Sequence, residues 1–288
     1  MRSRAGIPSA LCGATIVVAA AIVRPAAVQE RYHEKIAGTL VSFEMRLVPG
    51  GDVTVPGAAG GERRVTVEPF YIGVTEVTWN LYDVYALQLD RAAGRPGADA
   101  IARPSSPYGA PDYGWGHAGF PAISVTRAAA EAFCKWLSSK TGKAYRVPSE
   151  AEWARAAALA AGGKRLPAGR RDAIAWHRGN SPARTHQVAT KEPDALGLFD
   201  LFGNAGEWVR PDDGALVLRG GSFRDEPGAI GPASRAVQDA SWNETDPQLP
   251  KSVWWLSDAP FAGFRVVLSG NGLSAIAGST PADPGGAP

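Results

Sequence analysis

The chain has 288 residues, of which 45% are hydrophobic and 20% charged, a composition typical of a folded globular protein. Its 30 Lys and Arg residues against 28 Asp and Glu residues give a net charge of +2, and no run of basic residues marks a groove. Nucleic acid is therefore not an expected partner. The 34 Gly, 23 Pro and 9 Trp residues favour a loop-rich fold anchored by large aromatic side chains over a helix bundle.

Residues 1–28 have the pattern of a secretory signal peptide. Arg2 and Arg4 form a positive start, residues 10–23 are apolar, and the small pair 26–27 follows. We therefore expect an exported protein, periplasmic or extracellular. The alternative is an uncleaved membrane anchor, although the apolar run is shorter than the roughly 20 residues that span a bilayer. Contact with a membrane is expected only through this segment.

The rest of the chain is expected to form one domain. A linker is predicted over residues 29–42, the domain over residues 43–268, and a flexible tail without a core-forming pattern over residues 269–288. Without the signal segment the chain keeps one cysteine, Cys134, so no intramolecular disulfide can fix its loops. A bound cation is one candidate for that role.

Strands are predicted at the start of the domain. Residues 43–57 alternate apolar and polar side chains around a Pro-Gly-Gly turn, which is typical of two strands joined by a turn. The β-branched and aromatic residues of 63–77 continue the strand pattern. Thr78 is the expected N-cap of a first helix. The apolar face of that helix is expected to consist of Leu81, Tyr82, Tyr85 and Leu89.

Residues 91–119, rich in Gly, Pro, Ser and Tyr, are expected to form a long surface loop. Thr126 is the expected N-cap of a second helix that ends at Gly142 and turns Cys134 inward. A third helix is predicted to begin at Ser149. Its capping box pairs Ser149 with Glu152, and its alanine-rich body stops at two glycines, Gly162 and Gly163. Short strands are expected near residues 216–218 and 264–268.

Six stretches of the chain follow one another in a recognisable order. They are LVPGG, FYIGVTEVTWNLYDVY, FPAISVTRAAAEAFCKWLSSKTGKAYRVPSEAEWARAA, GLFDLFGNAGEWV, LRGGSF and GFRVV. Together they resemble the sulfatase-modifying-factor family, whose best-known member is the formylglycine-generating enzyme. The resemblance implies a single α+β domain with little regular secondary structure, the family's variant of the C-type lectin fold.

The stretch DLFGNAGEW, residues 200–208, has the composition of a cation loop. Asp200 and Glu207 offer carboxylates, and its two glycines let the backbone turn carbonyl oxygens inward. The resemblance implies one calcium site, and the corresponding positions here are Asp200, Gly203, Ala205 and Glu207. The alternative is that Asp200 and Asn204 only make turn hydrogen bonds while Trp208 fills the core.

The resemblance also implies an oxidation that the chain lacks the sulfur to perform. The family's enzyme oxidises a cysteine of its sulfatase client at a copper ion held by two thiolates, which are the soft ligands that Cu(I) prefers. Its cysteines follow an Arg-Gly-Gly-Ser motif, present here at residues 219–222. By counting, Asp225 and Ile230 stand in the thiol positions. Cys134 alone cannot form a dithiolate, so copper is not expected.

No other catalytic pattern replaces the thiols. Asp225 and Glu226 are adjacent carboxylates, but neighbours in an extended segment point in opposite directions. The chain has no H-E-x-x-H motif and no nucleophile elbow. Its histidines also lack metal-ligand spacing, and they are His33, His117, His177 and His186.

These patterns predict an exported, calcium-stabilised member of the family that binds a polypeptide or a glycan without converting cysteine to formylglycine. Whether it is an enzyme of another kind stays open. The expected binding cleft consists of Arg219, Ser222, Arg224, Asp225 and Trp255. One alternative is an enzyme with a non-thiol centre, which would need Asp225, Glu226 and a histidine to converge. The other is a structural component of an exported assembly, which would need an exposed apolar patch and no concave pocket.

Overall fold

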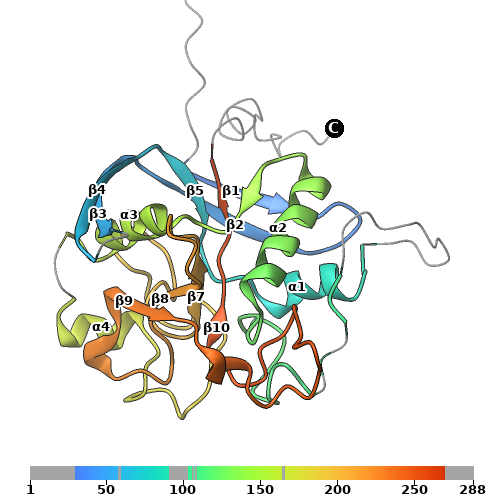
Figure 1. Cartoon of the computed structure of the whole chain (residues 1–288). Helices are drawn as coiled ribbons and strands as arrows, with labels where there is room; N and C mark the ends of the chain where they lie inside the picture. Colours follow the sequence, from blue (N-terminus) through green and yellow to red (C-terminus); the bar gives the residue numbers. More distant parts are fainter. Residues whose placement is uncertain are drawn as a thin grey trace, which may run out of the picture.

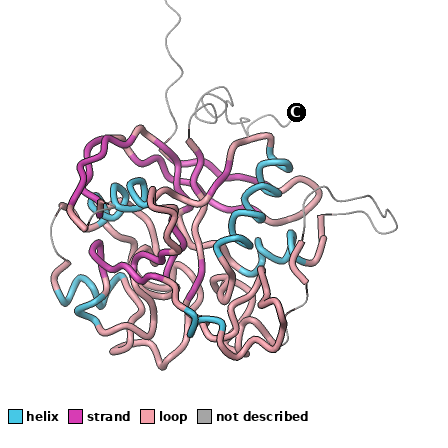
Figure 2. Tube along the Cα trace, in the orientation of Figure 1, coloured by secondary structure: helices cyan, strands magenta, loops and turns pink. Residues whose placement is uncertain are grey.

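The computed structural model describes residues 30–57, 60–90, 103–105, 107, 109–163 and 166–269 (Figure 1). The expected signal segment and all of the expected tail except Ser269 lie outside these residues. Figure 2 shows that loops form much of the chain between short helices and strands. The predicted α+β class with little regular secondary structure is therefore confirmed. Within the described ranges, no helix is both long and apolar enough to cross a membrane.

The larger sheet has five strands, which pair antiparallel throughout. In spatial order they are β1 (Arg31–Lys35), β2 (Ser42–Val48), β5 (Phe70–Gly73), β11 (Val267–Leu268) and β6 (Tyr145–Arg146). Strand β1 lies within residues 29–42, so the linker prediction is wrong for these residues. The alternating burial of β1 shows why, because Tyr32 and Glu34 turn inward and Glu34 forms an ion pair with Lys143 at 2.6 Å.

A smaller sheet and a hairpin complete the strands. The four-stranded sheet has the order β10 (Ala262–Gly263), β7 (Gly206–Val209), β8 (Val217–Gly220) and β9 (Gly231–Val237). The hairpin pairs β3 (Gly51–Pro56) with β4 (Glu62–Val67). The strands predicted over residues 43–57 and near residues 216–218 are confirmed. The strand expected over residues 264–268 is reduced to β11.

The helices are α1 (Trp79–Ala86), α2 (Arg127–Thr141), α3 (Glu150–Ala160) and α4 (Ala168–Ile174), with short 3-10 turns η1 (Pro227–Ala229) and η2 (Ala240–Asn243). The predicted caps hold for α2 and α3. Thr126 accepts a hydrogen bond from the Ala129 N–H, and Ser149 and Glu152 form the full capping box. Leu89, by contrast, lies beyond the end of α1 and is 58% exposed, because α1 stops at Ala86.

The five-stranded sheet separates two hydrophobic cores. Successive side chains of a strand point to opposite faces, so Tyr71 of β5 joins one core while Phe70 and Ile72 join the other. The first core gathers the aromatic side chains of α1 and α2, and Cys134 lies in it as predicted. The second core holds Trp153 of α3. A polar side chain buried between these cores lowers stability unless it is hydrogen-bonded.

Candidate functional site

The loop that precedes β7 buries an acidic side chain with one free oxygen. Asp200 is 2% exposed and has a backbone φ of 55°, a left-handed conformation. Its Oδ2 atom accepts a hydrogen bond from the Ala189 N–H at 2.8 Å, while its Oδ1 atom is buried without a partner. Burial raises the pKa of Asp200 to about 6, although the Ala189 N–H opposes this effect. A proton or a cation would satisfy the free oxygen.

The tight turn of this loop requires glycine at one of the expected calcium positions. Gly203 has a φ of 82°, and a Cβ atom there would lie 2.2 Å from the Trp176 carbonyl oxygen. Ala205, two residues later, is buried, and its N–H donates to the Glu76 Oε1 atom at 2.9 Å. The backbone of the loop is therefore held by a carboxylate that was not among the expected ligands.

The other expected calcium carboxylate, Glu207 of β7, is already paired. Its Oε1 atom accepts from Arg265 Nε at 2.9 Å and Arg265 Nη2 at 2.7 Å. Its Oε2 atom accepts from Trp153 Nε1 at 2.9 Å. Both members of the Glu207–Arg265 pair are fully buried. Because a carboxylate has about four lone-pair sites, Glu207 keeps room for one more electropositive neighbour.

Glu76 completes this group of charges, which we call the carboxylate cluster: Glu76, Asp200 and Glu207 around Arg265. Burial, followed by the nearby charges of Asp200 and Glu207, raises the pKa of Glu76 well above its usual range. With all three carboxylates ionised, one guanidinium would leave two negative charges uncompensated in the interior. The cluster therefore needs protons or a further cation.

The donor set of the cluster suits a hard cation. Carboxylate and backbone carbonyl oxygens are the ligands that calcium prefers, and the free Asp200 oxygen supplies one of them. In the part of the chain that the structure describes, no three His, Cys, Asp or Glu side chains converge as a ready-made metal site. A calcium ion here would therefore depend on carbonyl oxygens as much as on carboxylates.

The sequence analysis missed Glu76 and Arg265. Each is a charged residue inside an apolar stretch, VTEVT and GFRVV, and that isolation is the signal that could have identified them. Their pairing partners lie far away in the sequence, so spacing alone could not reveal the cluster.

The structure divides the five residues of the expected binding cleft among three places. Arg219 lies in the interior, where Nη1 donates to Glu150 Oε1 at 2.6 Å and Nη2 donates to the Pro232 carbonyl oxygen at 2.6 Å. Burial lowers the pKa of Arg219, and Glu150 opposes that effect. Arg219 therefore supports the fold beneath the surface.

Ser222, Arg224 and Asp225 line one shallow cavity of about 260 Å³, the Ser222 hollow. Asp225 closes a turn there, because its Oδ2 atom accepts from the Ser222 N–H at 2.7 Å and from the Ser222 hydroxyl at 2.8 Å. The Arg224 guanidinium lies over the ring of Phe261, 3.2 Å from the ring centroid. Such a stacked guanidinium is held in place while its N–H groups can still bind.

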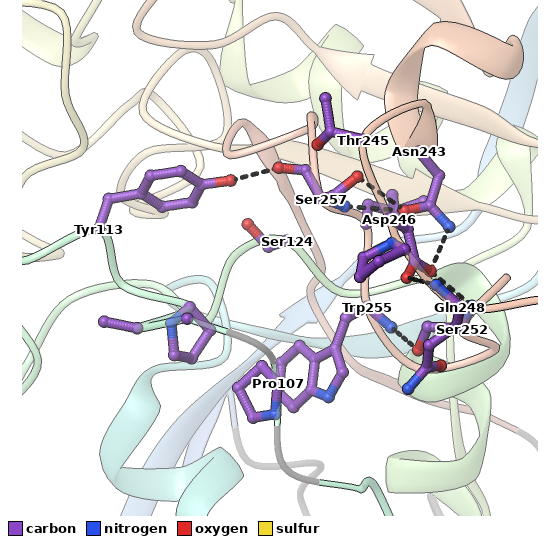
Figure 3. Close-up of a pocket in the computed structure, with 15 residues that line it drawn as sticks. Pro107, Tyr113, Ser124, Asn243, Thr245, Asp246, Gln248, Ser252, Trp255 and Ser257 are labelled. Atoms are coloured by element: carbon purple, nitrogen blue, oxygen red, sulfur yellow. Dashed lines mark hydrogen bonds between the residues drawn. The ribbon is translucent and has the colours of Figure 1, made fainter.

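Trp255 lines a different cavity, the Trp255 pocket, which includes Tyr113, Ser124, Asn243 and Asp246 (Figure 3). No residue lines both cavities. The structure therefore does not bring Trp255 together with Ser222, Arg224 and Asp225, although the sequence analysis grouped them.

The positions that counting matches to the family's thiols, Asp225 and Ile230, hold no sulfur. Asp225 is engaged by Ser222, and Ile230 is buried against the second core. Cys134 is buried in α2, and burial raises the pKa of its thiol far above the usual range. A thiol that keeps its proton is a poor ligand and a poor nucleophile.

The other acidic and histidine side chains near the Ser222 hollow do not converge. Glu226 forms an exposed ion pair with Arg178 at 3.0 Å. His177 is buried, and its Nε2 atom lies 2.7 Å from Asp172 Oδ1 while its Nδ1 atom accepts from the Gly179 N–H. Among the described residues, no histidine joins Asp225 and Glu226 in a catalytic arrangement.

Comparisons with known proteins identify the family and the fold. A model of the Sulfatase-modifying factor enzyme 1-like domain matches residues 37–247, and so begins inside the stretch expected to be a linker. Treponema denticola variable protein 1 superposes with a TM-score of 0.61 at 21% identity, over 83% of this chain and 99% of that one. PvdO from Pseudomonas aeruginosa superposes with a TM-score of 0.56 at 26% identity, over 82% of this chain and 99% of that one.

One further relative is a much longer protein. The serine/threonine-protein kinase pkn1 of Chlamydia pneumoniae is 35% identical over 96 residues. The match covers 33% of this chain and 14% of the kinase. Because the chain spans so little of that protein, the two share a segment and no more is inferred from the kinase's name.

Asp194 should make stability depend on pH. It lies near Arg265, and its Oδ1 atom accepts from two backbone N–H groups while its Oδ2 atom has no partner. Burial raises its pKa from 3.8 to about 6. The folded state therefore keeps a proton that the unfolded state has lost between these values, so stability falls as pH rises through this window.

The Asp194→Asn variant does not titrate, so comparing it with the wild type isolates this effect. The stability advantage of the wild type should be larger at pH 4 than at pH 7, by up to about 3 kcal/mol. Urea unfolding at both pH values measures it. The Asp52→Asn variant is the control of opposite sign, because hydrogen bonds from Thr66 and Arg64 lower the pKa of Asp52. An advantage for Asp194 that is independent of pH would contradict the prediction.

Proposed function

Because the chain belongs to the sulfatase-modifying factor enzyme 1-like domain family, we propose that it is an exported, calcium-stabilised member that binds a polypeptide or a glycan and performs no copper-dependent oxidation. The proposal depends most on the side chains found at the two positions where the family's enzyme has its thiols. There the Asp225 carboxylate closes a turn with Ser222, and Ile230 is buried. Neither side chain can hold Cu(I) as a thiolate does.

The Ser222 hollow offers the means to bind. The Arg224 guanidinium is stacked on Phe261 and presents several N–H donors beside the hollow. Peptide carbonyl oxygens and sugar hydroxyls both accept such hydrogen bonds. The fold alone does not specify a ligand, so the proposal depends on this site and not on the family's best-known activity.

The enzyme with a non-thiol centre is the second candidate. It is less favoured because Asp225 and Glu226 are engaged by different partners, Ser222 and Arg178. A structural component is also less favoured, because the described surface contains concave cavities suited to ligands.

Calcium would stabilise this protein by completing the carboxylate cluster. Asp200 and Glu207 would supply carboxylate oxygens, and the carbonyls at Gly203 and Ala205 would complete the ligand set. The proposed export is consistent with a calcium site, since the ion is available outside the cell at about the concentrations that extracellular calcium modules bind.

The direct test of the catalytic proposal is an assay of the mature protein with Cu(I), oxygen and a cysteine-containing sulfatase peptide. No aldehyde should form and no oxygen should be consumed above the rate with Cu(I) alone, because no second thiolate can reach the metal. A copper-dependent formylglycine-generating enzyme is the positive control. Stoichiometric aldehyde formation would refute the proposal.

Calcium should raise the thermal stability of the wild-type protein. With a dissociation constant of roughly 0.1 to 1 mM, about 1 mM free ion should add roughly 0.4 to 1.4 kcal/mol. The Asp200→Asn variant should lose this increment. Asp212→Asn, which changes an exposed carboxylate paired with Arg63, should keep it. Equal calcium effects in all three proteins would show that the ion binds elsewhere.

Binding can be tested with arrays of extended peptides and glycans. A ligand of the Ser222 hollow should bind the wild type and lose roughly 10-fold or more in affinity with Arg224→Ala, since hydrogen bonds to a charged donor contribute about 1.5 to 3 kcal/mol. Arg178→Ala removes a matched exposed arginine and should have no such effect. Ligands insensitive to Arg224 would place binding on another surface.

A further inference from the structure

The Trp255 pocket has a cavity volume of about 260 Å³ and lies apart from the Ser222 hollow. Figure 3 shows Ser124 in its middle, with Tyr113 on one side, Asn243 and Asp246 on the other, and Trp255 beside Pro107. The cavity is small for a drug-sized ligand but large enough for a single ring. Its use goes beyond the function proposed above.

The aromatic wall of the pocket is rigid. The Trp255 indole stacks on Trp79 with ring centroids 6.4 Å apart and meets the ring of Tyr82 edge-on at 6.0 Å. Its Nε1 atom donates to the Ser105 carbonyl oxygen at 2.8 Å. On the other side, the Tyr113 ring stacks on Trp115 at 5.0 Å. A planar ring entering the pocket would therefore meet preorganised aromatic surfaces.

Ser124 is the one polar group of the pocket that is both buried and unsatisfied. It is 3% exposed and has a φ of 61°, and its hydroxyl forms no hydrogen bond of standard geometry, although the Tyr113 hydroxyl lies beside it. The neighbouring Tyr113 hydroxyl donates instead to the Ser257 carbonyl oxygen at 2.8 Å. A serine with a left-handed backbone and a buried hydroxyl without a good hydrogen bond each lower stability. Such features concentrate at binding sites.

Asn243 and Asp246, two further polar side chains of the pocket, are already paired. Asn243 Oδ1 accepts from the Ser257 N–H at 2.9 Å and from the Ser257 hydroxyl at 3.0 Å. Asp246 accepts from the backbone N–H groups of Gln248 and Ser252. A sugar needs several free partners inside a site, whereas Ser124 carries the one buried hydroxyl among the described lining residues. This pattern matches a ring that carries a single hydroxyl.

The charge of the pocket lining and the residues beside the pocket restrict the kind of ligand that fits. Asp246 is the one charged side chain among the described residues that line the pocket, which disfavours an anionic ring. The chain neighbours of two lining residues are exposed apolar side chains, Leu249 at 91% and Val253 at 61%. Exposed apolar groups beside a pocket are typical of a surface that contacts a polypeptide.

We propose that the Trp255 pocket binds the side chain of a tyrosine in a partner polypeptide. The phenol ring packs against Trp255 and Tyr113, and the phenol hydroxyl pairs with the Ser124 hydroxyl. Leu249 and Val253 contact the apolar neighbours of that tyrosine.

The test compares N-acetyl-tyrosinamide with N-acetyl-phenylalaninamide on the mature protein by calorimetry. The tyrosine amide should bind with a dissociation constant on the order of 1 mM. Because one net hydrogen bond distinguishes the ligands, it should bind roughly 3- to 10-fold more tightly than the phenylalanine amide. Equal affinities, or tighter binding of a methyl glycoside, would overturn the proposal.

Ser124→Gly is the informative variant, since glycine adopts the same left-handed backbone and lacks the CH2OH side chain that carries the hydroxyl. It should bind both amides equally. Ala183→Gly, at another left-handed position with φ of 54° but on the exposed surface, is the control and should retain the preference for tyrosine. A preference that survives in Ser124→Gly would refute the role of the serine hydroxyl.

A longer peptide tests whether the partner is a polypeptide. A Leu-Tyr-Leu peptide should bind more tightly than the tyrosine amide to the wild type, and Leu249→Ser should remove the gain. If free p-cresol binds as tightly as the peptide, the pocket is a small-molecule site and the polypeptide partner is excluded.

Discussion

The buried pair of Glu207 and Arg265 is the interaction on which the two sheets depend. Glu207 belongs to β7 of the smaller sheet, and Arg265 lies between β10 and β11, so the pair joins the two sheets. Arg265 also donates to the carbonyl oxygens of Gly73 and Phe199, and Trp153 of α3 donates to Glu207. Removing one member of such a pair leaves an unpaired interior charge, a loss of about 3 to 5 kcal/mol.

The loop beside this pair is acidic, and its backbone is tightly turned. Glu76 and Asp200 bring two more carboxylates into the interior beside this pair, and burial raises the pKa of both. Asp200 and Asn204 of this loop adopt left-handed conformations, and a Cβ atom at Gly203 would clash with the Trp176 backbone. Structure and charge therefore favour a site that gains from a proton or a calcium ion.

Much of the local structure could be predicted from the sequence. The caps at Thr126 and Ser149 and the buried Cys134 are set by residues within one helix turn of each other, so their patterns are readable. Strand β1 was missed because its apolar content is one tyrosine among charged residues, and its inward Glu34 is explained only by Lys143. Whether such a charged segment forms a strand depends on partners far away in the sequence.

The candidate sites show the same limit. Sequence counting placed Arg219 and Trp255 in one cleft with Ser222, Arg224 and Asp225. Arg219 instead pairs with the distant Glu150, and Trp255 packs on Trp79. Likewise the unsatisfied hydroxyl of Ser124 has no signature in the sequence, because it follows from the packing of the loops around it.

Calcium binding by the carboxylate cluster is tested most directly by the calcium stoichiometry of the mature protein together with the number of protons released on binding. Titration calorimetry near pH 6, in buffers of different ionisation enthalpy, gives both quantities. If the carboxylate cluster holds the ion, one calcium binds per chain and displaces protons from the carboxylates whose pKa is raised. Absence of calcium binding, or binding without proton release, would show that the carboxylate cluster is not the calcium site.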